Sequence, residues 1–315
     1  MSNPVPVTPD NFIRAETDRY FGMFVDRGAL GSFFHHRDLP PIDLPGVRPN
    51  RDTLYSEVVF DLDAGPATVT LPDPDDRFLS FIVIDQDHYV FKVAYGAGSH
   101  ELTRGEAGTR YVFAAVRMLF DPSSPADLET VHALQDALRI EQASRGTFDV
   151  PAWDEASQTK VRKALLELSS TLPDLRNGGG RRDEVDPVRH LIATASGWGL
   201  NPDKDAIYLN VTPPNDDGSG AYELTVGEVP VDGFWSISVY DAEGHFVENN
   251  RAAYTLNDIT AAKNPDGSVT IRFGGDDDQP NCLPIFPGWN YMVRLYRPRP
   301  EVLDGRWTFP SLEAA

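Results

Sequence analysis

FLSFIVIDQDHYVFKVAYG, residues 78–96, is the stretch of sequence that decides the fold. It contains two apolar runs rich in Val, Ile, Phe and Tyr, separated by the polar residues DQDH. Residues of these types favour β-strands, and turn residues between two such runs favour antiparallel pairing. Similar short runs, broken by Gly, Pro and Asp, fill the chain from Thr53 to about Met118. This region is therefore predicted to be an antiparallel β-sandwich or barrel.

Helical patterns lie on both sides of this β region. An amphipathic helix is expected to begin at Thr8 or Asp10 and to stop at Gly28, and a proline-rich connector over residues 28–50 should follow an extended path. After the β region, one helix is predicted from the Ser124 cap to Gly146 and a second over residues 154–172. The glycine-rich segment 176–184, RNGGGRRDE, is predicted to be a mobile surface loop, because it lacks the lysine of a phosphate-binding loop.

The last third of the chain returns to strand patterns. Its alternating runs are separated by turns such as DAEG (241–244) and NPDG (264–267), which indicate hairpins. We predict a mainly β protein with a helical insert, of the α+β class, in which a helical segment joins two β-sandwich or jelly-roll-like domains. The expected division is residues 1–123, a helical connecting region 124–200, and residues 201–315.

Composition narrows the possible partners. With 28 Lys and Arg against 48 Asp and Glu, the net charge is −20, which excludes a nucleic-acid binder. No apolar stretch approaches the roughly 20 residues that cross a bilayer, so no membrane partner is expected. A single cysteine, Cys282, and the absence of a leader-like N-terminus predict a cytoplasmic protein, with that thiol buried and inert.

Familiar catalytic motifs are missing from the sequence. It has no Gly-x-Ser-x-Gly elbow, no His-Glu-x-x-His, no dinucleotide fingerprint and no Walker lysine. No organic cofactor is therefore expected. The hypothesis of a bound divalent metal is kept, although no specific motif in the sequence supports it.

Polar residues gather in PNRDTLYSE, residues 49–57, where the connector meets the first strand. Asn50, Arg51 and Asp52 have two interpretations: they fix the entry of the chain by local hydrogen bonds, or they line a site. In a site, Arg51 would hold an anionic group, while Asp52 and Tyr55 would act as base and acid.

A second polar group follows the strand at residues 78–84. If the strand continues, Asp85 and Asp87 extend its Phe81 face, where buried carboxylates need partners, a metal or an open cavity. In the alternative, the strand ends near Ile84 and DQDH is a hairpin turn at the surface. A metal site of Asp85, Asp87 and His88, with His35 or His36 from FFHHRD, is possible but matches no known spacing.

A third group lies in GFWSISVYDAEGHFVENNRAAYTLND, residues 233–258. Alternation places Trp235, Ile237 and Val239 on one face of a strand and Ser236, Ser238 and Tyr240 on the other. Asn249, Asn250, Arg251 and Tyr254 either line a pocket or fasten their own loop, and spacing does not separate these interpretations.

The same stretches resemble a known family. Residues 50–73 and 77–90 resemble the N-terminal half, and residues 229–246, 249–258 and 281–298 the C-terminal half, of a two-domain bacterial family of unknown function. The resemblance implies an N-terminal β domain, a helical linker and a C-terminal jelly-roll-like domain, often in a homo-oligomer. Some members carry a carboxylesterase-like label, for which this chain offers no nucleophile elbow.

Two functional hypotheses follow. The first is a small-molecule enzyme with hydrolytic or acid/base chemistry of the lyase or isomerase type; the second is a ligand-binding or oligomeric assembly protein without catalysis. The candidate catalytic residues are Asp52, Tyr55, Asp85, Asp87 and His88, and the candidate substrate-binding residues are Asn50, Arg51, His35, Trp235, Tyr240, Asn250 and Arg251. The first hypothesis expects the first two clusters to meet in one pocket.

Overall fold

The computed structural model describes residues 3–42, 47–275 and 278–314. The chain forms two compact units. Unit 1 consists of Met1–Arg37, Leu54–Leu119 and Pro125–Asp203, and unit 2 of Asp38–Thr53, Phe120–Ser124 and Lys204–Ala315. The helices expected to connect two domains thus belong to unit 1, and much of the proline-rich connector belongs to unit 2. Part of that connector, residues 43–46, lies outside the described residues.

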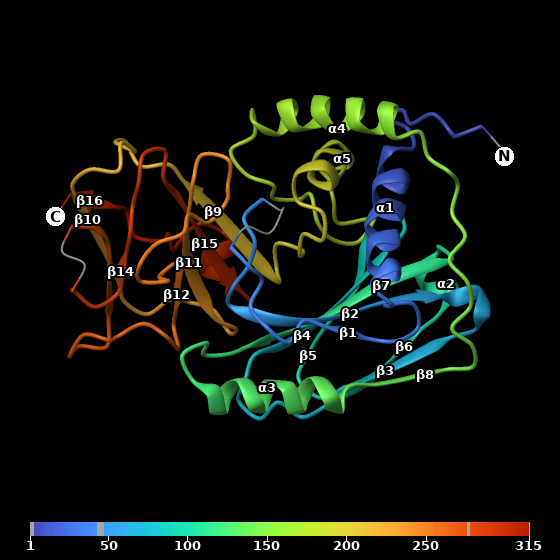
Figure 1. The fold of residues 1–315 in the computed structure, drawn as a ribbon, viewed down its shortest axis with the longest axis horizontal. Helices are drawn as coiled ribbons and strands as arrows, with labels where there is room; N and C mark the ends of the chain where they lie inside the picture. The colour runs from blue at the N-terminus through green and yellow to red at the C-terminus, as the bar shows by residue number, and fades with distance from the viewer. Residues whose placement is uncertain (1–2, 43–46, 276–277, 315) are drawn as a thin grey trace. The chain divides into compact units, whose positions relative to one another are not determined.

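Unit 1 contains two β-sheets. The larger has the strand order β1-β2-β7-β4-β5 and the smaller the order β6-β3-β8 (Figure 1). The strands are β1 (Phe34–His35), β2 (Thr53–Asp61), β3 (Ala67–Leu71), β4 (Leu79–Asp85), β5 (Val90–Tyr95), β6 (Gly98–Leu102), β7 (Tyr111–Leu119) and β8 (Arg139–Gln142). β4 and β5 pair antiparallel, as the opening stretch of sequence predicts.

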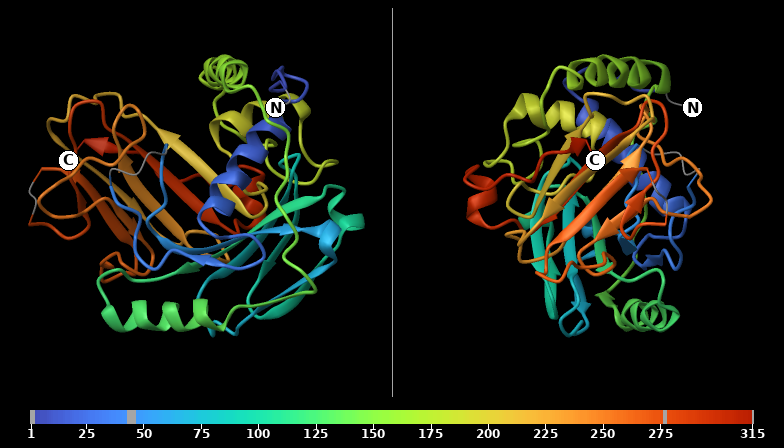
Figure 2. Two further views of the ribbon diagram at one scale, coloured as in Figure 1. Left: turned by 45° about the vertical axis from the view of Figure 1, so that its right-hand side comes forward. Right: turned by 90° about the vertical axis from the view of Figure 1, so that its left-hand side faces the viewer.

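Helices cover the larger sheet of unit 1. They are α1 (Phe12–Asp26), α2 (Arg104–Ala107), α3 (Pro125–Ala137), α4 (Glu155–Ser169) and α5 (Pro187–Ser196), with a 3-10 turn η1 (Leu62–Ala64). Figures 1 and 2 show α1, α4 and α5 on one side of this sheet and α3 on the other. On the side of α1, Phe21 packs with Ile82 and Ile84 of β4 and Phe113 of β7 in a buried core. That core fixes the β4 end of the sheet against the helices.

The helix predicted to run from Ser124 to Gly146 is shorter than expected. It ends at Ala137, and the following residues form β8, in which Ile140 lies opposite Val69 of β3. The helical spacing of Leu138 and Ile140 was misleading, because pairing with β3 offers these residues a sheet edge that the local pattern does not reveal.

Unit 2 is a β-sandwich. Its sheets have the orders β14-β13-β10-β16 and β12-β11-β15-β9. The elements are β9 (Ala206–Val211), β10 (Ala221–Val226), β11 (Trp235–Tyr240), β12 (Thr255–Asn257), β13 (Val269–Gly274), β14 (Cys282–Leu283), β15 (Asn290–Tyr296), α6 (Pro300–Leu303) and β16 (Glu313–Ala314). Trp235, Ile237 and Val239 lie in its core with residues of both sheets, as the alternation predicts. Cys282 is buried, as expected.

The mainly β, two-unit α+β architecture expected from the sequence is therefore confirmed. Within the described residues, no helix is both long and apolar enough to span a membrane.

Candidate functional site

A tight turn joins β4 to β5 and carries the second polar group of the sequence. The Oδ1 atom of Asp85 accepts hydrogen bonds from the backbone N–H groups of Asp87 (2.8 Å) and Tyr89 (3.0 Å). His88 adopts a left-handed backbone conformation with φ of 64°. The hairpin-turn interpretation is thus confirmed, but its surface location is wrong: Asp85 is 5% exposed and His88 1%. A buried turn needs partners for its side chains, and these come from distant segments.

One oxygen of Asp85 remains available. Its Oδ2 atom accepts no hydrogen bond from the described residues and is not among the side-chain atoms sealed from solvent. Asp85 lines a pocket of about 220 Å³ together with Tyr89, Phe91, residues 106–109 and residues 181–183. Burial raises the pKa of Asp85 to about 7, because desolvation opposes the charged form. A carboxyl group of this kind exists in both protonation states near neutral pH.

The glycine-rich segment forms one wall of this pocket. Gly178, Gly179 and Gly180 are buried, so the predicted surface location is wrong for them, whereas residues 181–184 are exposed as predicted. A Cβ at Gly178 would lie 2.8 Å from the Ala193 side chain, and the Gly180 carbonyl accepts a hydrogen bond of 2.9 Å from the Val90 N–H beside the turn. Only glycine allows so close an approach to neighbouring backbone. The three glycines are therefore a fixed support for the two arginines that follow them.

Those arginines bring positive charge to the pocket. The guanidinium of Arg182 lies 4.3 Å from the centroid of the Tyr89 ring and pairs with Asp87 at 3.2 Å. Arg181 donates from Nη1 to the Phe91 carbonyl at 3.2 Å, and its side chain is 56% exposed. Both keep N–H donors for a bound anion, since a guanidinium carries five.

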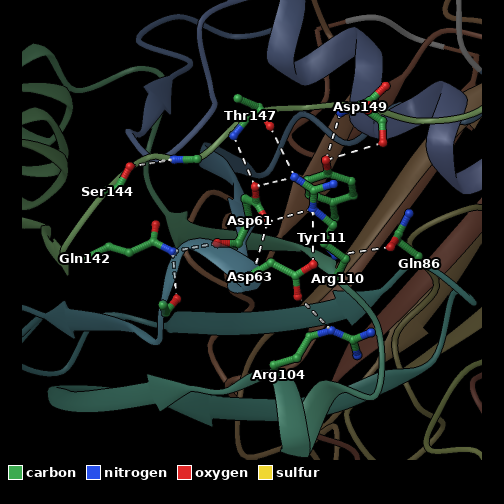
Figure 3. A network of polar contacts seen from close by, with 12 residues as sticks. Asp61, Asp63, Gln86, Arg104, Arg110, Tyr111, Gln142, Ser144, Thr147 and Asp149 are labelled. Carbon is green, nitrogen blue, oxygen red and sulfur yellow. Dashed lines mark hydrogen bonds and ion pairs between the residues drawn. The ribbon is translucent and has the colours of Figure 1, made fainter.

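Residues 106–109 form another part of the pocket wall, and Arg104 and Arg110, which flank them in the sequence, belong to the polar network shown in Figure 3. Arg110 donates to both carboxylate oxygens of Asp61, at 3.0 and 2.8 Å, and Asp61 also accepts from the Thr147 N–H at 3.1 Å. Arg104 of α2 donates to Asp63 at 3.2 Å. Asp61 and Arg110 are far apart in sequence, and no motif in the sequence predicted this pair.

Two candidate catalytic residues of the turn have structural partners instead. Asp87 pairs with Arg14 of α1 at 2.6 Å as well as with Arg182. His88 donates from Nδ1 to the Thr194 hydroxyl at 2.9 Å, and its Nε2 accepts from the Gly199 N–H at 2.8 Å. Burial lowers the pKa of His88 well below its usual range. His88 is thus a neutral, fully bonded core histidine and has no proton to exchange with a ligand.

The predicted meeting of Tyr55 and Asp85 does not occur. On β7, Arg117 lies over the Tyr55 ring at 5.3 Å and pairs in register with Ser80, at the far end of β4 from Asp85. Tyr55 therefore lies at the Ser80 end of the sheet, and Ser80 is five residues, or about 16 Å at roughly 3.3 Å per residue, from Asp85 along β4. His35 belongs to the Tyr55 end, since its Nδ1 lies 2.7 Å from the hydroxyl of Ser56.

This separation bears on the metal hypothesis. In β1, His35 pairs in register with Ser56 of β2, and Phe34 pairs with Glu57. His35 and its neighbour His36 therefore lie beside the Tyr55 end of β2 and not beside the turn that carries Asp85. His36 instead lies 2.8 Å from Glu57. Among the residues that the structure describes, no three His, Cys, Asp or Glu side chains come together as metal ligands would.

Asp52 lies in unit 2, in a buried chain of hydrogen bonds. Arg294 donates to Ser238 at 2.9 Å, and Ser238 donates to Thr255 at 2.9 Å. Thr255 and Asn257 donate to Asp52 Oδ1, at 3.2 and 3.1 Å. Asp52 is 1% exposed and its burial raises its pKa. The chain connects a buried acid to a buried guanidinium through two hydroxyl groups.

Asn50 and Arg51 fix the segment that leads to Asp52. Asn50 Oδ1 accepts from the Asp52 N–H at 2.8 Å, which is the local hydrogen bonding considered in the first interpretation. Arg51 donates to the Pro40 carbonyl and lies 5.4 Å from the centroid of the Tyr254 ring. Burial lowers the pKa of Arg51.

The residues of the third polar group lie partly in the core of unit 2 and partly on its surface. Trp235 belongs to the sandwich core, and the Tyr240 hydroxyl donates to the Pro49 carbonyl at 2.9 Å while it accepts from Arg294 at 2.6 Å. Asn250 and Arg251 are exposed, in a loop in which the Asn249 side chain accepts from the Arg251 N–H at 3.1 Å. The Asn249 side chain thus fastens its own loop, which is the second of the two interpretations given for this group.

Two segments of the chain match families of unknown function. Residues 30–114 match "Protein of unknown function (DUF1254)" and residues 210–300 match "Protein of unknown function (DUF1214)". The chain is therefore a two-domain protein in which these two domains of unknown function follow one another. This confirms the resemblance noted in the sequence.

Solved structures share the fold. A crystal structure of a Vibrio parahaemolyticus protein is 17% identical, with 97% of this chain and 98% of that chain covered and a TM-score of 0.71. An uncharacterised Burkholderia cenocepacia protein is 15% identical, with 96% and 87% covered and a TM-score of 0.56. None of the curated proteins matches the chain.

Proposed function

We propose that unit 1 is an enzyme domain that binds a small anionic molecule in the Asp85 pocket and exchanges a proton with it through Asp85 Oδ2. The observation that carries the proposal is the unequal use of the two Asp85 oxygens. Oδ1 is fixed by two backbone N–H groups, while Oδ2 has no hydrogen bond from the described residues and belongs to a residue of the pocket wall. A general base needs such a free lone pair on a rigidly held group.

The chemistry of the pocket suits acid/base catalysis at neutral pH. With burial raising the pKa of Asp85 to about 7, the carboxylate can take a proton and the carboxylic acid can return it. Arg181 and Arg182 supply the N–H donors that recognise a carboxylate or phosphate group. At about 220 Å³ the pocket is smaller than the roughly 300–1,000 Å³ typical of drug-sized ligands. A small acid undergoing isomerisation or elimination is the substrate class that we favour.

A ligand screen followed by a proton-exchange assay tests the proposal. Small carboxylic acids, phosphate esters, esters and lactones are first screened by thermal shift at about pH 7. Any hit is then incubated with enzyme in D₂O, and its C–H signals are followed by ¹H NMR. We expect an anionic hit that loses stabilisation in Arg181→Gln, and solvent deuterium in the hit that disappears in Asp85→Asn while binding persists.

Asp258→Asn is the matched control. Burial raises the pKa of Asp258 to about 6, yet this residue belongs to unit 2 and does not line the pocket. The control should bind and exchange as the unaltered protein does. Binding without deuterium exchange in the unaltered protein would favour the alternative, a ligand-binding protein without catalysis. No stabilisation by any anion would contradict the proposal.

A further inference from the structure

His190, in the first half of α5, makes two hydrogen bonds that determine its charge. Its side chain is fully buried, and each ring nitrogen lies 2.9 Å from a backbone carbonyl oxygen. Nδ1 faces the carbonyl of Gly178 in the glycine-rich segment, and Nε2 faces the carbonyl of Asp87 in the Asp85 turn. One imidazole ring therefore joins α5 to two of the structures that build the pocket.

A carbonyl oxygen can only accept a hydrogen bond, and a neutral imidazole has only one N–H group. In the neutral ring, one nitrogen lone pair would face a carbonyl lone pair at 2.9 Å, and neither buried group would be satisfied. We infer that His190 is a buried imidazolium that donates from both nitrogens and so positions the turn that carries Asp85. His190 is a positioning residue for the proposed site, because it acts through the turn.

The surroundings of His190 explain how a buried cation is tolerated. Burial and the first half of a helix both oppose a positive charge. Against this, the His190 ring stacks on the Tyr89 ring, with centroids 4.3 Å apart and planes 6° apart, and a cation over an aromatic face is favoured. Charged and titratable groups on the elements packed around it include Asp85, Asp87, His88 and Tyr89 of the turn, Arg182 beside it, Arg14 and Asp18 of α1, Asp186 and Arg189 of α5, and Glu16 of α1 paired with Arg19 and with Arg162 of α4.

His88 provides an internal control for this inference. Its ring centroid lies 5.4 Å from that of His190, and it is equally buried. The Thr194 hydroxyl donates to the His190 carbonyl at 2.8 Å, so it accepts from His88 Nδ1, and the Gly199 N–H donates to His88 Nε2. One donor and one acceptor position make His88 the neutral Nδ1–H tautomer. Two stacked histidines are thus expected in opposite charge states.

The inference is tested by NMR on the full chain with ¹⁵N-labelled histidine. Long-range ¹H–¹⁵N correlation at about pH 8.5, where histidines with the ordinary pKa of about 6.5 are neutral, distinguishes the three ring forms. We expect one buried ring with both nitrogens protonated, His190, and a second, His88, with only Nδ1 protonated. An unprotonated nitrogen in the His190 ring would overturn the inference. The signals are assigned in the unaltered protein through their contacts with the Tyr89 and Trp198 rings.

A second measurement tests the positioning role. In His190→Gln the amide carries no charge, and both of its N–H groups lie on one nitrogen, so it cannot reproduce donors on two ring nitrogens that face different carbonyls. The ¹³C carboxyl signal of Asp85 should then titrate at a higher pH, because a nearby positive charge favours the carboxylate. An unchanged Asp85 titration in a folded variant would overturn the positioning role. Because neither experiment uses a ligand, these outcomes are independent of the proton-exchange assay that tests the proposed function.

Discussion

Asp61 and Asp85 both end a strand of the same sheet, and both are almost fully buried, at 2% and 5% exposed. Their partners differ. Burial acts to raise the pKa of Asp61, but two hydrogen bonds from Arg110 and two from backbone N–H groups outweigh it and leave that pKa below its usual range. Asp85 has no such cation on its carboxylate, so burial prevails and raises its pKa to about 7. The same residue type thus has a lowered pKa in one place and a raised pKa in the other.

Asp85→Asn should stabilise the protein relative to the unaltered chain, and this difference should increase as the pH rises. The folded pKa of about 7 lies above the ordinary value of 3.8, so the folded state retains a proton that the unfolded state has lost. The stability of the unaltered protein therefore falls as the pH rises from about 4 to about 7, and the asparagine variant lacks this loss. Its advantage in the free energy of unfolding should grow by about 2 kcal/mol between about pH 5.5 and pH 8. Urea unfolding at the two pH values measures this growth, and a constant difference would contradict the prediction.

Asp61→Asn should instead destabilise the protein, by an amount that does not change between about pH 5.5 and pH 8. The lowered pKa of Asp61 means that its carboxylate stabilises the folded state at every pH above about 4 and loses this effect only as the pH falls further. Loss of the charge-assisted hydrogen bonds should cost roughly 2 kcal/mol in the free energy of unfolding, by the same amount at about pH 5.5 and pH 8. The same urea series serves as the check, and a variant as stable as the unaltered protein would show that the network of Figure 3 is dispensable.

At the scale of elements, the glycine-rich segment shows how packing overrides composition. Three consecutive glycines and two arginines are typical of a mobile loop, and the local sequence offers no other signal. Its three glycines are nevertheless buried between α5 and β5, because residues without side chains can approach their neighbours closely. Its order depends on neighbours that are distant in sequence.

Gly179→Ala should therefore destabilise unit 1. The added Cβ would lie 2.8 Å from the Asn201 carbonyl oxygen and 2.9 Å from that of Leu200, and neither backbone atom can move aside cheaply. A cost of about 1–3 kcal/mol is typical of such overpacking. Gly105→Ala in α2 is the control, since its Cβ would have no atom within 4 Å and alanine favours a helix. Thermal unfolding should show a lower midpoint for the first variant only, and equal midpoints would contradict the close packing.

At the scale of the whole molecule, the net charge of −20 is the dominant property. Charges of one sign repel one another in the compact state more than in the expanded chain. Raising the ionic strength from about 20 mM to about 300 mM NaCl, which shortens the screening length to below about 10 Å, should therefore raise the thermal midpoint by a few degrees. A midpoint that falls with salt would show instead that the ion pairs contribute more than the repulsion.

The candidate site was only partly predictable. The turn residues Asp85, Asp87 and His88 stood out because polar residues follow a long apolar strand, and they do lie at the proposed pocket or beside it. Their roles did not follow from the sequence, because those depend on partners such as Arg14, Thr194 and Gly199. His190 gave no signal, since a single histidine in an apolar helix is typical of a core position.

By itself, the sequence determined the strand and helix types, the β-sandwich of unit 2 and the polar turn, because hydrophobic periodicity and turn residues act over a few neighbouring positions. Only the tertiary structure decided which end of the sheet Tyr55 and Asp85 occupy, whether the glycines are ordered, and which aspartate keeps a proton. These depend on strand register and on contacts between segments far apart in the chain. The pKa of a buried group depends on the charges and hydrogen-bond donors that surround it in space, and the sequence alone does not give the distances to them.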